Sequence, residues 1–549
     1  MKKIITRQTL FVFIVALIAG FALLHQGLLP THDGEYHVVR FYEFDKALRD
    51  GNLFPRWASD LNYGYGIPLF SYVYPLPNYF ASFLHAFGIS FIDAFKLNMF
   101  TAILLAGFSF YLWAKSFFDE KGALVGTVFY LFSPYFFVDT YIRGSVGEVW
   151  ALALFPAFLW VLTKVLKDNK NVFLPITALV LGLIILSHNI LALIFFPFAI
   201  VYGLLLISSS KQKIVNLLKL IVILLIGLGF ASIFWIPAIL ETKFTVGLQI
   251  YDYKSNFVDL YQLIAPSWGS GFYGGGLGDQ MSVQIGIANL LAVFLAFIVL
   301  FKFFRKKDYR VKLIVYFIIS FFLVALLMLQ VSLPVWKVMP LFNYFQFPWR
   351  FLSLEILICS FLAAGVAYFI KQKVFWVIIL VSPIILGFNY AHPAYYMDRA
   401  DSYYMTRSNF IDGTNSIGNV FNTLWFKAKP VRMSAKIESN QDVVVNKSVV
   451  KSSNYQFVVT VSKPSMITLN TAYFPGWEAK IDSKVVQIQK NNEGLIVIPV
   501  LKGKHSLGVD FGDTPIRAMS AFISLISFIV IVTLIIKTWY IRGKHEDSN

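Results

Sequence analysis

The sequence predicts a polytopic α-helical membrane protein with about twelve transmembrane helices and a small extracytoplasmic β-sandwich domain before the last helix. Of its 549 residues, 57% are apolar and 14% are charged, whereas soluble domains average about 25% charged residues. The apolar residues form runs close to the roughly 20 residues that a bilayer core requires. The net charge of +17 comes mostly from Lys and Arg in short loops between these runs. It therefore indicates membrane orientation rather than a nucleic-acid partner.

The predicted spans cover approximately residues 8–29, 92–114, 122–140, 148–166, 171–187, 190–208, 214–239, 283–304, 311–330, 350–370, 373–390 and 517–537. The first follows Lys2, Lys3 and Arg7, as in a signal peptide, but its apolar run is too long and lacks a small-x-small cleavage site, so we expect an uncleaved anchor. The single cysteine, Cys359, lies inside an apolar run. An intrachain disulfide and a cysteine-based metal cluster are therefore excluded.

The distribution of Lys and Arg predicts that both termini are cytoplasmic. With the N-terminus inside, alternate loops carry the basic residues, for example between Lys302 and Arg310. The short opposite loops carry little positive charge: Arg143 in one, none around His188, and Lys337 in another. This asymmetry follows the positive-inside rule. We therefore expect a multi-pass protein of the cytoplasmic membrane with its large loops and β domain outside.

Three longer segments are predicted on the outer side. The first outer loop, residues 30–91, is rich in Tyr, Gly and Pro and contains one short helix at about 77–88. The second outer loop, residues 241–282, contains "APSWGSGFYGGGLGDQ", whose glycines permit close approach of a ligand; a flexible lid and a plain linker both explain it. In residues 391–516, "KSSNYQFVVTVSK", "SMITLNTAYF" and "GLIVIPV" alternate as strands do, after a short helical start at 395–425.

The chain therefore divides into a membrane domain (1–390), an extracytoplasmic domain (391–516) and a final helix with a cytoplasmic tail (517–549). Aromatic residues in "AYFPGW" either stack on sugars or fill the core of the sandwich, and the second interpretation is favoured.

Titratable side chains gather at the predicted outer membrane boundary, where a charge is costly and usually has a role or a partner. They are Asp33 and Glu35 after the first span, Arg143 and Glu148 in "YIRGSVGEVW", His188 in "LSHNIL" and Arg350 in "FQFPWRFLSLE", with Glu355 slightly further inside. Topology places them at one depth, whereas their lateral arrangement stays open.

Each candidate also has an ordinary structural explanation. Asp33 can pair with His37 four residues later, or it can cap the helix that follows. His32 and His37 are about 140° apart around a helix and poorly placed to share a metal.

The remaining candidates can be explained in the same way. Glu148 at a helix start is favoured by the helix dipole, and His188 can be a satisfied helix-end histidine. Arg350 can extend toward lipid headgroups. Arg143 is harder to explain, because it is the only cation of a short outer loop, and its five donors suit a phosphate.

Several stretches together resemble one family: "THDGEYHVVR", "IRGSVGEVWA", "LSHN", "FPWRFL" and "AYFPGWEAKIDSKVVQI…GLIVIPVLKGKHSLGVDF". They resemble bacterial multi-span membrane proteins of the YfhO type, whose relatives are described as 6-pyruvoyl-tetrahydropterin synthase-related. The resemblance covers nearly the whole chain and depends on the order of the motifs. The sequence has no soluble enzyme domain or three-histidine zinc set that would support pterin chemistry. The family is in turn similar to C-type (GT-C) glycosyltransferases, which take sugar from a polyprenyl-phosphate carrier.

The resemblance implies a GT-C-like membrane domain that transfers a sugar from a polyprenyl-phosphate-linked donor to an envelope polymer or lipid acceptor. It implies an acidic base or metal ligand just after the first span, which is Asp33 here, with Glu35 and Glu148 assisting. Many members carry an adjacent acidic pair, but a glycine separates Asp33 from Glu35. A divalent cation, Mg or Mn, held by Asp33 and Glu148 therefore stays open. The substrate-binding candidates are His37, Arg143, His188 and Arg350.

Two other classes of function compete with this hypothesis: a transporter or lipid flippase, and a non-catalytic envelope scaffold whose β domain binds wall polymer. Transporters often carry charges near the midplane and have repeated halves. Here only Glu355 is internal, and the halves do not match. Convergence of Asp33, Glu148, Arg143 and Arg350 would favour sugar transfer, whereas a continuous polar path through the bilayer would favour transport.

Overall fold

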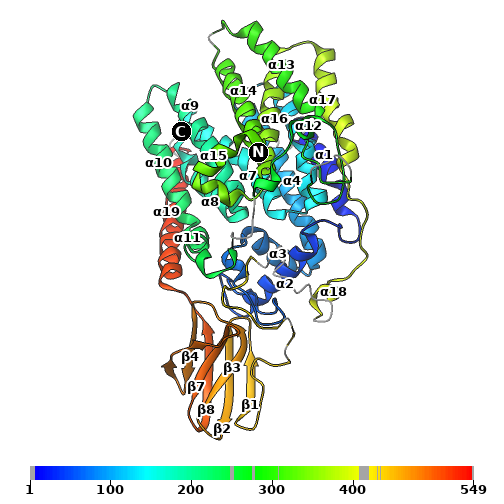
Figure 1. Ribbon diagram of the computed structural model, residues 1–549. Coiled ribbons are helices and arrows are strands. Elements are labelled where there is room, and N and C mark those ends of the chain that lie inside the picture. Colours follow the sequence, from blue (N-terminus) through cyan, green and yellow to red (C-terminus); the bar gives the residue numbers. More distant parts are fainter. Residues whose placement is uncertain are drawn as a thin grey trace.

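The computed structural model describes residues 6–247, 253–274, 279–306, 308–406, 420–429, 431–432 and 434–546. A bundle of helices forms most of the molecule, and a small β domain lies at one end (Figure 1). Helices α2 (Gly34–Arg49) and α3 (Leu76–Ala86) lie between the bundle and the β domain. We call the side that carries α2, α3 and the β domain the loop face.

Within the described residues, nine helices are long and apolar enough to cross a membrane, and a bent pair makes a tenth. The long helices are α1 (Arg7–Gly20, continued by a turn to Leu24), α4 (Phe91–Lys115), α7 (Val146–Leu166), α9 (Asn189–Ser208), α10 (Lys213–Phe230), α14 (Tyr309–Met328), α16 (Leu352–Phe369, preceded by a turn from Pro348), α17 (Lys373–Gly387, continued to Tyr390) and α19 (Pro515–Glu546). Two shorter apolar helices are α8 (Leu174–Ser187, preceded by a turn from Asn171) and α13 (Ile287–Phe303). Each predicted span therefore has an apolar helix, which confirms the polytopic helical fold class.

Two of the predicted spans are broken. The third consists of α5 (Glu120–Leu131), then α6 (Pro134–Phe137) and a π-helical turn (Val138–Arg143), with a bend of 48°. Proline supplies no backbone N–H, so Pro134 is suited to start a helix rather than continue one. The seventh predicted span consists of two helices, α10 and then α11 (Ser232–Leu240). The first break matters for the site, because the π-helical turn carries Arg143.

Helices α7 and α16 lie in the middle of the bundle and are buried along most of their length, whereas α10, α17 and α19 expose apolar faces. In a chain of this composition, exposed apolar helix faces are the surfaces that contact lipid. Helix α19 packs against α10 and α11 and leads away from the β domain (Figure 1).

The β domain contains a five-stranded antiparallel sheet and a three-stranded one. The first has the order β1-β2-β8-β4-β5, with strands Val443–Val450, Asn454–Val461, Gly503–Phe511, Trp477–Ile481 and Lys484–Val486. The second has the order β3-β7-β6, with strands Ser465–Ala472, Leu495–Val500 and Gln489–Lys490. The three segments predicted as strands correspond to β2, β3 and β7, which confirms the small antiparallel β domain.

Other expectations for the outer segments are met in part. The short helix of the first outer loop is α3, as predicted. The expected helical start at 395–425 is limited to α18 (Asp401–Met405) in the described residues, and 407–419 lie outside them. Phe474 and Trp477 of "AYFPGW" are buried, which confirms that they fill the core.

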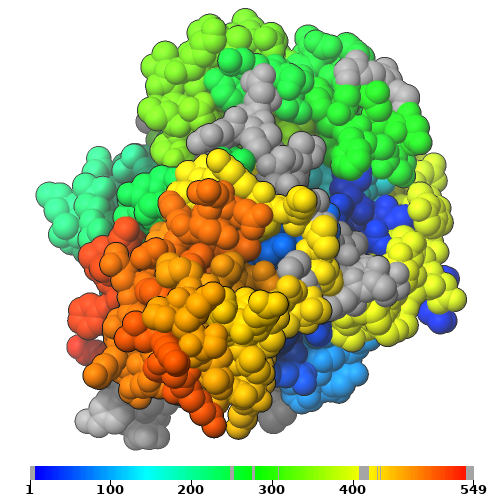
Figure 2. Space-filling model, turned by 60° about the horizontal axis from the view of Figure 1, so that its bottom comes forward, coloured from blue at the N-terminus to red at the C-terminus, as the bar shows by residue number. Residues whose placement is uncertain are grey.

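The first outer loop contributes to the core of the β domain. Trp57 is buried against Trp477 and Phe511, with ring centroids 5.3 and 5.1 Å apart. The main-chain N–H of Ala472 donates to the carbonyl of Tyr65 at 2.9 Å. Viewed from the loop face, the orange β domain lies against blue residues of the first outer loop (Figure 2). The loop and the β domain therefore share one apolar core.

Candidate active site

Backbone hydrogen bonds connect the segment after the first helix to the π-helical turn. The N–H groups of His32 and Asp33 donate to the carbonyls of Ile142 and Arg143, each at 2.9 Å. Gly144 ends the turn with φ of +63°, a conformation that glycine adopts without strain. A Cβ there would overlap the side-chain oxygen of Thr31. The predicted residues from these two distant parts of the chain are thus held side by side.

Glu148 is the centre of a buried ionic network on the first turn of α7. Arg143 Nη2 donates to its Oε1 at 2.7 Å, and Arg143 Nη1 forms an ion pair with its Oε2 at 2.6 Å. Arg350 Nε donates to Oε1 at 3.1 Å, and the Tyr135 hydroxyl donates to Oε2 at 3.2 Å. Glu148 is 0% exposed. The structure therefore brings together three of the predicted residues, which come from three different helical segments.

A second carboxylate balances the charge of this network. Arg143 also donates to Asp139, which lies on the same turn and is fully buried. Counted by formal charge, the two guanidinium groups and the two carboxylates of this cluster cancel. The Arg143 and Arg350 side chains also lie over the rings of Trp349 and Phe347, at 4.8 and 5.0 Å.

His188 is a helix-end histidine, as one of its predicted roles requires, whereas its role in substrate binding stays a prediction. Its Nδ1 accepts from the N–H of Leu191 at 3.1 Å and so caps α9. In a neutral ring the proton then resides on Nε2, which lies 3.5 Å from Glu148 Oε1. The histidine is thus a helix cap that also belongs to the network.

Asp33 precedes α2 but does not cap it with its side chain. Instead the Thr31 hydroxyl accepts from the N–H of Gly34 at 3.1 Å. The Asp33 carboxylate is half-buried, and within the described residues it has no hydrogen bond or ion pair. The capping explanation is therefore wrong, and the carboxylate is available for chemistry.

Two other predicted residues are engaged elsewhere. Glu35 accepts from Arg399 and from the Tyr404 hydroxyl, the latter at 2.9 Å, and so joins the first outer loop to the segment around α18. His37 does not pair with Asp33 through its side chain; it stacks on Phe95, with ring centroids 6.1 Å apart. Burial holds the pKa of His37 well below its usual value.

The second outer loop covers one side of this group. The His32 ring stacks on Phe272 at 4.5 Å, and its Nε2 lies 3.1 Å from the Ser270 carbonyl. Tyr273 of the same loop lies near Trp349, with centroids 6.3 Å apart. Burial lowers the pKa of His32. The described part of the second outer loop therefore packs on the candidate site.

Three residues near the site were not identified from the sequence: Asp139, Tyr74 and Arg40. Burial raises the pKa of the Tyr74 hydroxyl to about 12, and the charges acting on it are those of Arg40, Asp33, Glu148 and Arg143. The Tyr74 ring contacts that of His188, with centroids 5.0 Å apart, and so lies beside the ionic network. Asp139 could have been identified as a charge inside an apolar run, whereas Arg40 is one of several charged residues of α2 and nothing in the sequence distinguishes it.

The donor set does not fit the divalent cation considered above. Both oxygens of Glu148 are in ion-pair contact with cationic Arg143, and Arg350 adds a second positive charge. Within the described residues, no group of three His, Cys, Asp or Glu side chains is placed to hold a metal ion. Glu148 is therefore a poor ligand for a cation, and we assign no chemical step to a metal.

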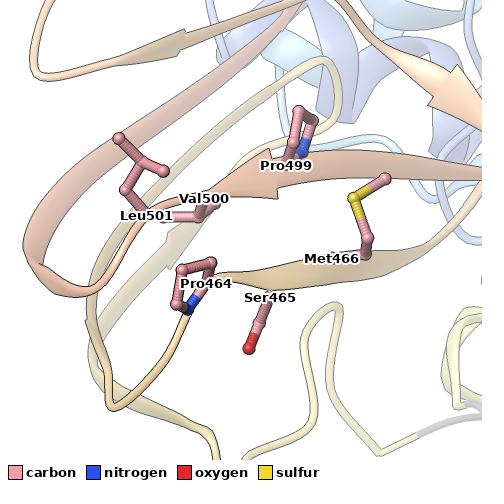
Figure 3. Close-up of a pocket in the computed structure, with 6 residues that line it drawn as sticks. All are labelled: Pro464, Ser465, Met466, Pro499, Val500 and Leu501. Atoms are coloured by element: carbon pink, nitrogen blue, oxygen red, sulfur yellow. The ribbon is translucent and has the colours of Figure 1, made fainter.

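A shallow hollow on the β domain is unrelated to these residues. It is lined by Pro464, Ser465, Met466, Pro499, Val500 and Leu501 on β3, β7 and the loops beside them (Figure 3). None of these lining residues is titratable, so the hollow offers no acid or base.

The chain is similar to two described families of membrane proteins. Residues 427–524 match the model of the bacterial membrane protein YfhO. A protein of Lactococcus lactis subsp. cremoris strain MG1363 that carries no functional description is 22% identical over an alignment of 352 residues, and the match covers 60% of this chain and 54% of that protein. The chain thus spans about half the length of this relative.

Among solved structures, the fold is similar to the cryo-EM structure of the arabinofuranosyltransferase AftD from Mycobacteria. The superposition has a TM-score of 0.49 and 15% sequence identity, and it covers 73% of this chain and 28% of that one. Residues 70–392, more than half of the chain, match the family model described as "6-pyruvoyl-tetrahydropterin synthase related domain; membrane protein". The protein therefore belongs to this family of membrane proteins.

Proposed function

We propose that the protein is a membrane glycosyltransferase that moves a sugar from a polyprenyl-phosphate carrier to an acceptor of the cell envelope. The acceptor is a polymer or a lipid that presents a hydroxyl group. In this proposal the loop face points out of the cytoplasm and both termini point into it. The asymmetry of Lys and Arg between the loops supports this orientation.

The observation that carries the proposal is the free Asp33 carboxylate beside a neutral, rigid ionic network. The main-chain N–H of Asp33 donates to the carbonyl of Arg143. The Arg143 side chain in turn donates to Glu148. Among the described residues this half-buried carboxylate makes no hydrogen bond or ion pair, and its oxygens are not enclosed by protein. Such a group is well placed to accept a proton.

The chemistry we assign to Asp33 is general base catalysis. The carboxylate takes the proton of the acceptor hydroxyl as its oxygen attacks the anomeric carbon of the sugar. The bond between that carbon and the carrier phosphate breaks, and its electron pair leaves with the lipid phosphate. The products are a glycoside, a lipid phosphate and a protonated Asp33, which then loses its proton to water.

The other predicted residues have supporting roles in this proposal. Arg143, Glu148, His188 and Arg350 form the framework that positions Asp33 through the backbone of the π-helical turn. Binding of the donor phosphate by Arg143 and Arg350 stays a prediction, and it would use guanidinium donors that are not bonded to Glu148. Glu35 positions the start of α2 through Arg399 rather than assisting the reaction.

Sugar transfer from a radiolabelled polyprenyl-phosphate donor, measured in membranes, tests the proposal. Asp33→Asn is expected to reduce transfer by about 10²- to 10⁴-fold, the typical contribution of a general base. Because the carboxylate makes no structural bond, the variant is expected to keep its melting temperature. The matched control is Asp93→Asn, which changes a carboxylate that already pairs with Lys96 at 2.9 Å.

Wild-type transfer rates in Asp33→Asn would contradict the proposal. So would movement of the intact donor across the membrane without cleavage of its sugar, because that result indicates a flippase. A loss of transfer in Asp93→Asn equal to that in Asp33→Asn would show that the assay reports folding rather than chemistry.

A further inference from the structure

Arg40 is a buried cation that has no counter-ion among the residues that the structure describes. It lies on α2, its side chain is 7% exposed, and its Nε is fully enclosed without a hydrogen-bond partner. Within the described residues, none of its nitrogens has a hydrogen bond or an ion pair. Burying an unpaired charge is costly, so such a group normally finds a partner.

The other buried arginines show what is missing at Arg40. The described part of the chain buries five arginines. Four of them have a carboxylate partner: Arg56 with Asp513, Arg143 and Arg350 with Glu148, and Arg517 with Glu241. Arg40 alone among the five has none, so its positive charge is left unbalanced.

Arg40 faces the same region as the proposed base. It follows Asp33 by seven residues, which is two helical turns and therefore the same side of α2. Among the charges that act on the Tyr74 hydroxyl, that of Arg40 is the strongest, followed by those of Asp33, Glu148 and Arg143. His37 lies between Asp33 and Arg40 on this side of α2, and the positive charge of Arg40 helps to lower its pKa.

We propose that Arg40 binds the phosphate group of the substrate, which supplies the missing negative charge. This inference rests on the proposed function and adds an anion-binding residue to that same site, beside Arg143 and Arg350. A guanidinium presents donors in a fixed geometry that matches phosphate oxygens. Arg143 and Arg350 are already neutralised by Glu148 and Asp139, so Arg40 provides the net positive charge that an anion needs.

The phosphate can come from a lipid headgroup or from the solvent, and two probes distinguish these sources. We would measure binding of undecaprenyl phosphate and of inorganic phosphate to the purified full-length protein, from the rise in melting temperature with probe concentration. Arg40→Gln is expected to raise the apparent Kd for the bound probe by about 10- to 100-fold, the loss of a hydrogen bond to a charged group. Arg40→Lys is expected to have an apparent Kd between those of the wild type and Arg40→Gln, because it keeps the charge but not the paired donors.

The control is Arg49→Gln on the same helix. The Arg49 side chain is 62% exposed and pairs with Asp45 at 2.7 Å, so its replacement is expected to leave phosphate binding unchanged. Without phosphate, Arg40→Gln is expected to melt at or above the wild-type temperature, because it removes an unpaired buried charge. A structural role for Arg40 would instead lower this temperature.

A lower Kd for undecaprenyl phosphate than for inorganic phosphate assigns the lipid headgroup, and equal values assign free phosphate. The inference is overturned if the wild-type protein binds neither probe, or if Arg40→Gln binds as tightly as the wild type. Sugar transfer by a protein whose phosphate affinity is independent of Arg40 would overturn this inference alone. Phosphate binding through Arg40 without sugar transfer would overturn the proposed function alone.

Discussion

Replacing Glu148 by Gln tests the ionic network directly, because it removes one charge and changes the shape of the side chain very little. Glu148 neutralises Arg143 and Arg350, at 2.6 and 3.1 Å, in a place where it is 0% exposed. Removing one partner of a buried ion pair costs about 3–5 kcal/mol, since it leaves an uncompensated charge. We expect Glu148→Gln to lower the free energy of unfolding by this amount.

The assay is equilibrium unfolding in detergent, compared with Glu120→Gln as a control. The Glu120 side chain is 49% exposed and pairs with Lys115 at 2.9 Å, and exposed pairs contribute only about 0–1 kcal/mol. Adding Arg350→Met to Glu148→Gln is expected to restore at least about 1 kcal/mol, because it removes one of the unpaired cations. The reasoning is refuted if Glu148→Gln lowers the free energy of unfolding no more than Glu120→Gln does. It is also refuted if the losses caused by Glu148→Gln and by Arg350→Met simply add in the double variant.

Three further predictions concern the elements around the site. Trp57→Ala is expected to cost about 3–5 kcal/mol and to make the β domain sensitive to protease, because Trp57 is buried against Trp477; limited proteolysis at wild-type rates would contradict the shared core. Gly144→Ala forces a left-handed backbone on alanine and overlaps Thr31, so we expect a drop in both melting temperature and transfer rate, and an unchanged transfer rate would show that this turn does not position Asp33. Burial raises the pKa of Glu43 from 4.5 to about 8, so the folded protein keeps a proton that the unfolded chain has lost. Stability is therefore expected to fall as pH rises from 4.5 to about 8 and then to level off; Glu43→Gln should remove this slope, and an equal slope in that variant would count against the assignment.

Periodicity and charge predict most of this fold. Runs of about 20 apolar residues locate the spans, because the bilayer imposes their length. Alternation of period two locates β2 and β3, because one face of each strand is buried, whereas β7 is a short continuous apolar run. The break at Pro134 was not predicted, since the apolar run continues through it and the run alone shows no bend. The insertion of Trp57 into the β domain was also not predicted, because it joins segments about 400 residues apart.

The site was predicted in part. The sequence placed Arg143, Glu148 and Arg350 at one membrane depth, and their meeting depends on helix packing that no local pattern encodes. It did not single out Asp139, which is one charge in an apolar run, or Arg40, which is one of several charged residues of α2. Whether the Asp33 carboxylate is free or caps α2 depends on which of two nearby side chains, Asp33 or Thr31, accepts the N–H of Gly34. Both alternatives fit the sequence.

The most direct test of the account is a structure of the protein bound to a non-cleavable phosphonate analogue of a polyprenyl-phosphate sugar. The account predicts that the phosphonate contacts Arg40 and that the anomeric carbon faces the Asp33 carboxylate. The space for the acceptor hydroxyl should lie within about 2.6–3.2 Å of that carboxylate, or one water molecule away. A ligand bound on the opposite face of the helical bundle, or an Asp33 side chain directed away from the sugar, would contradict it.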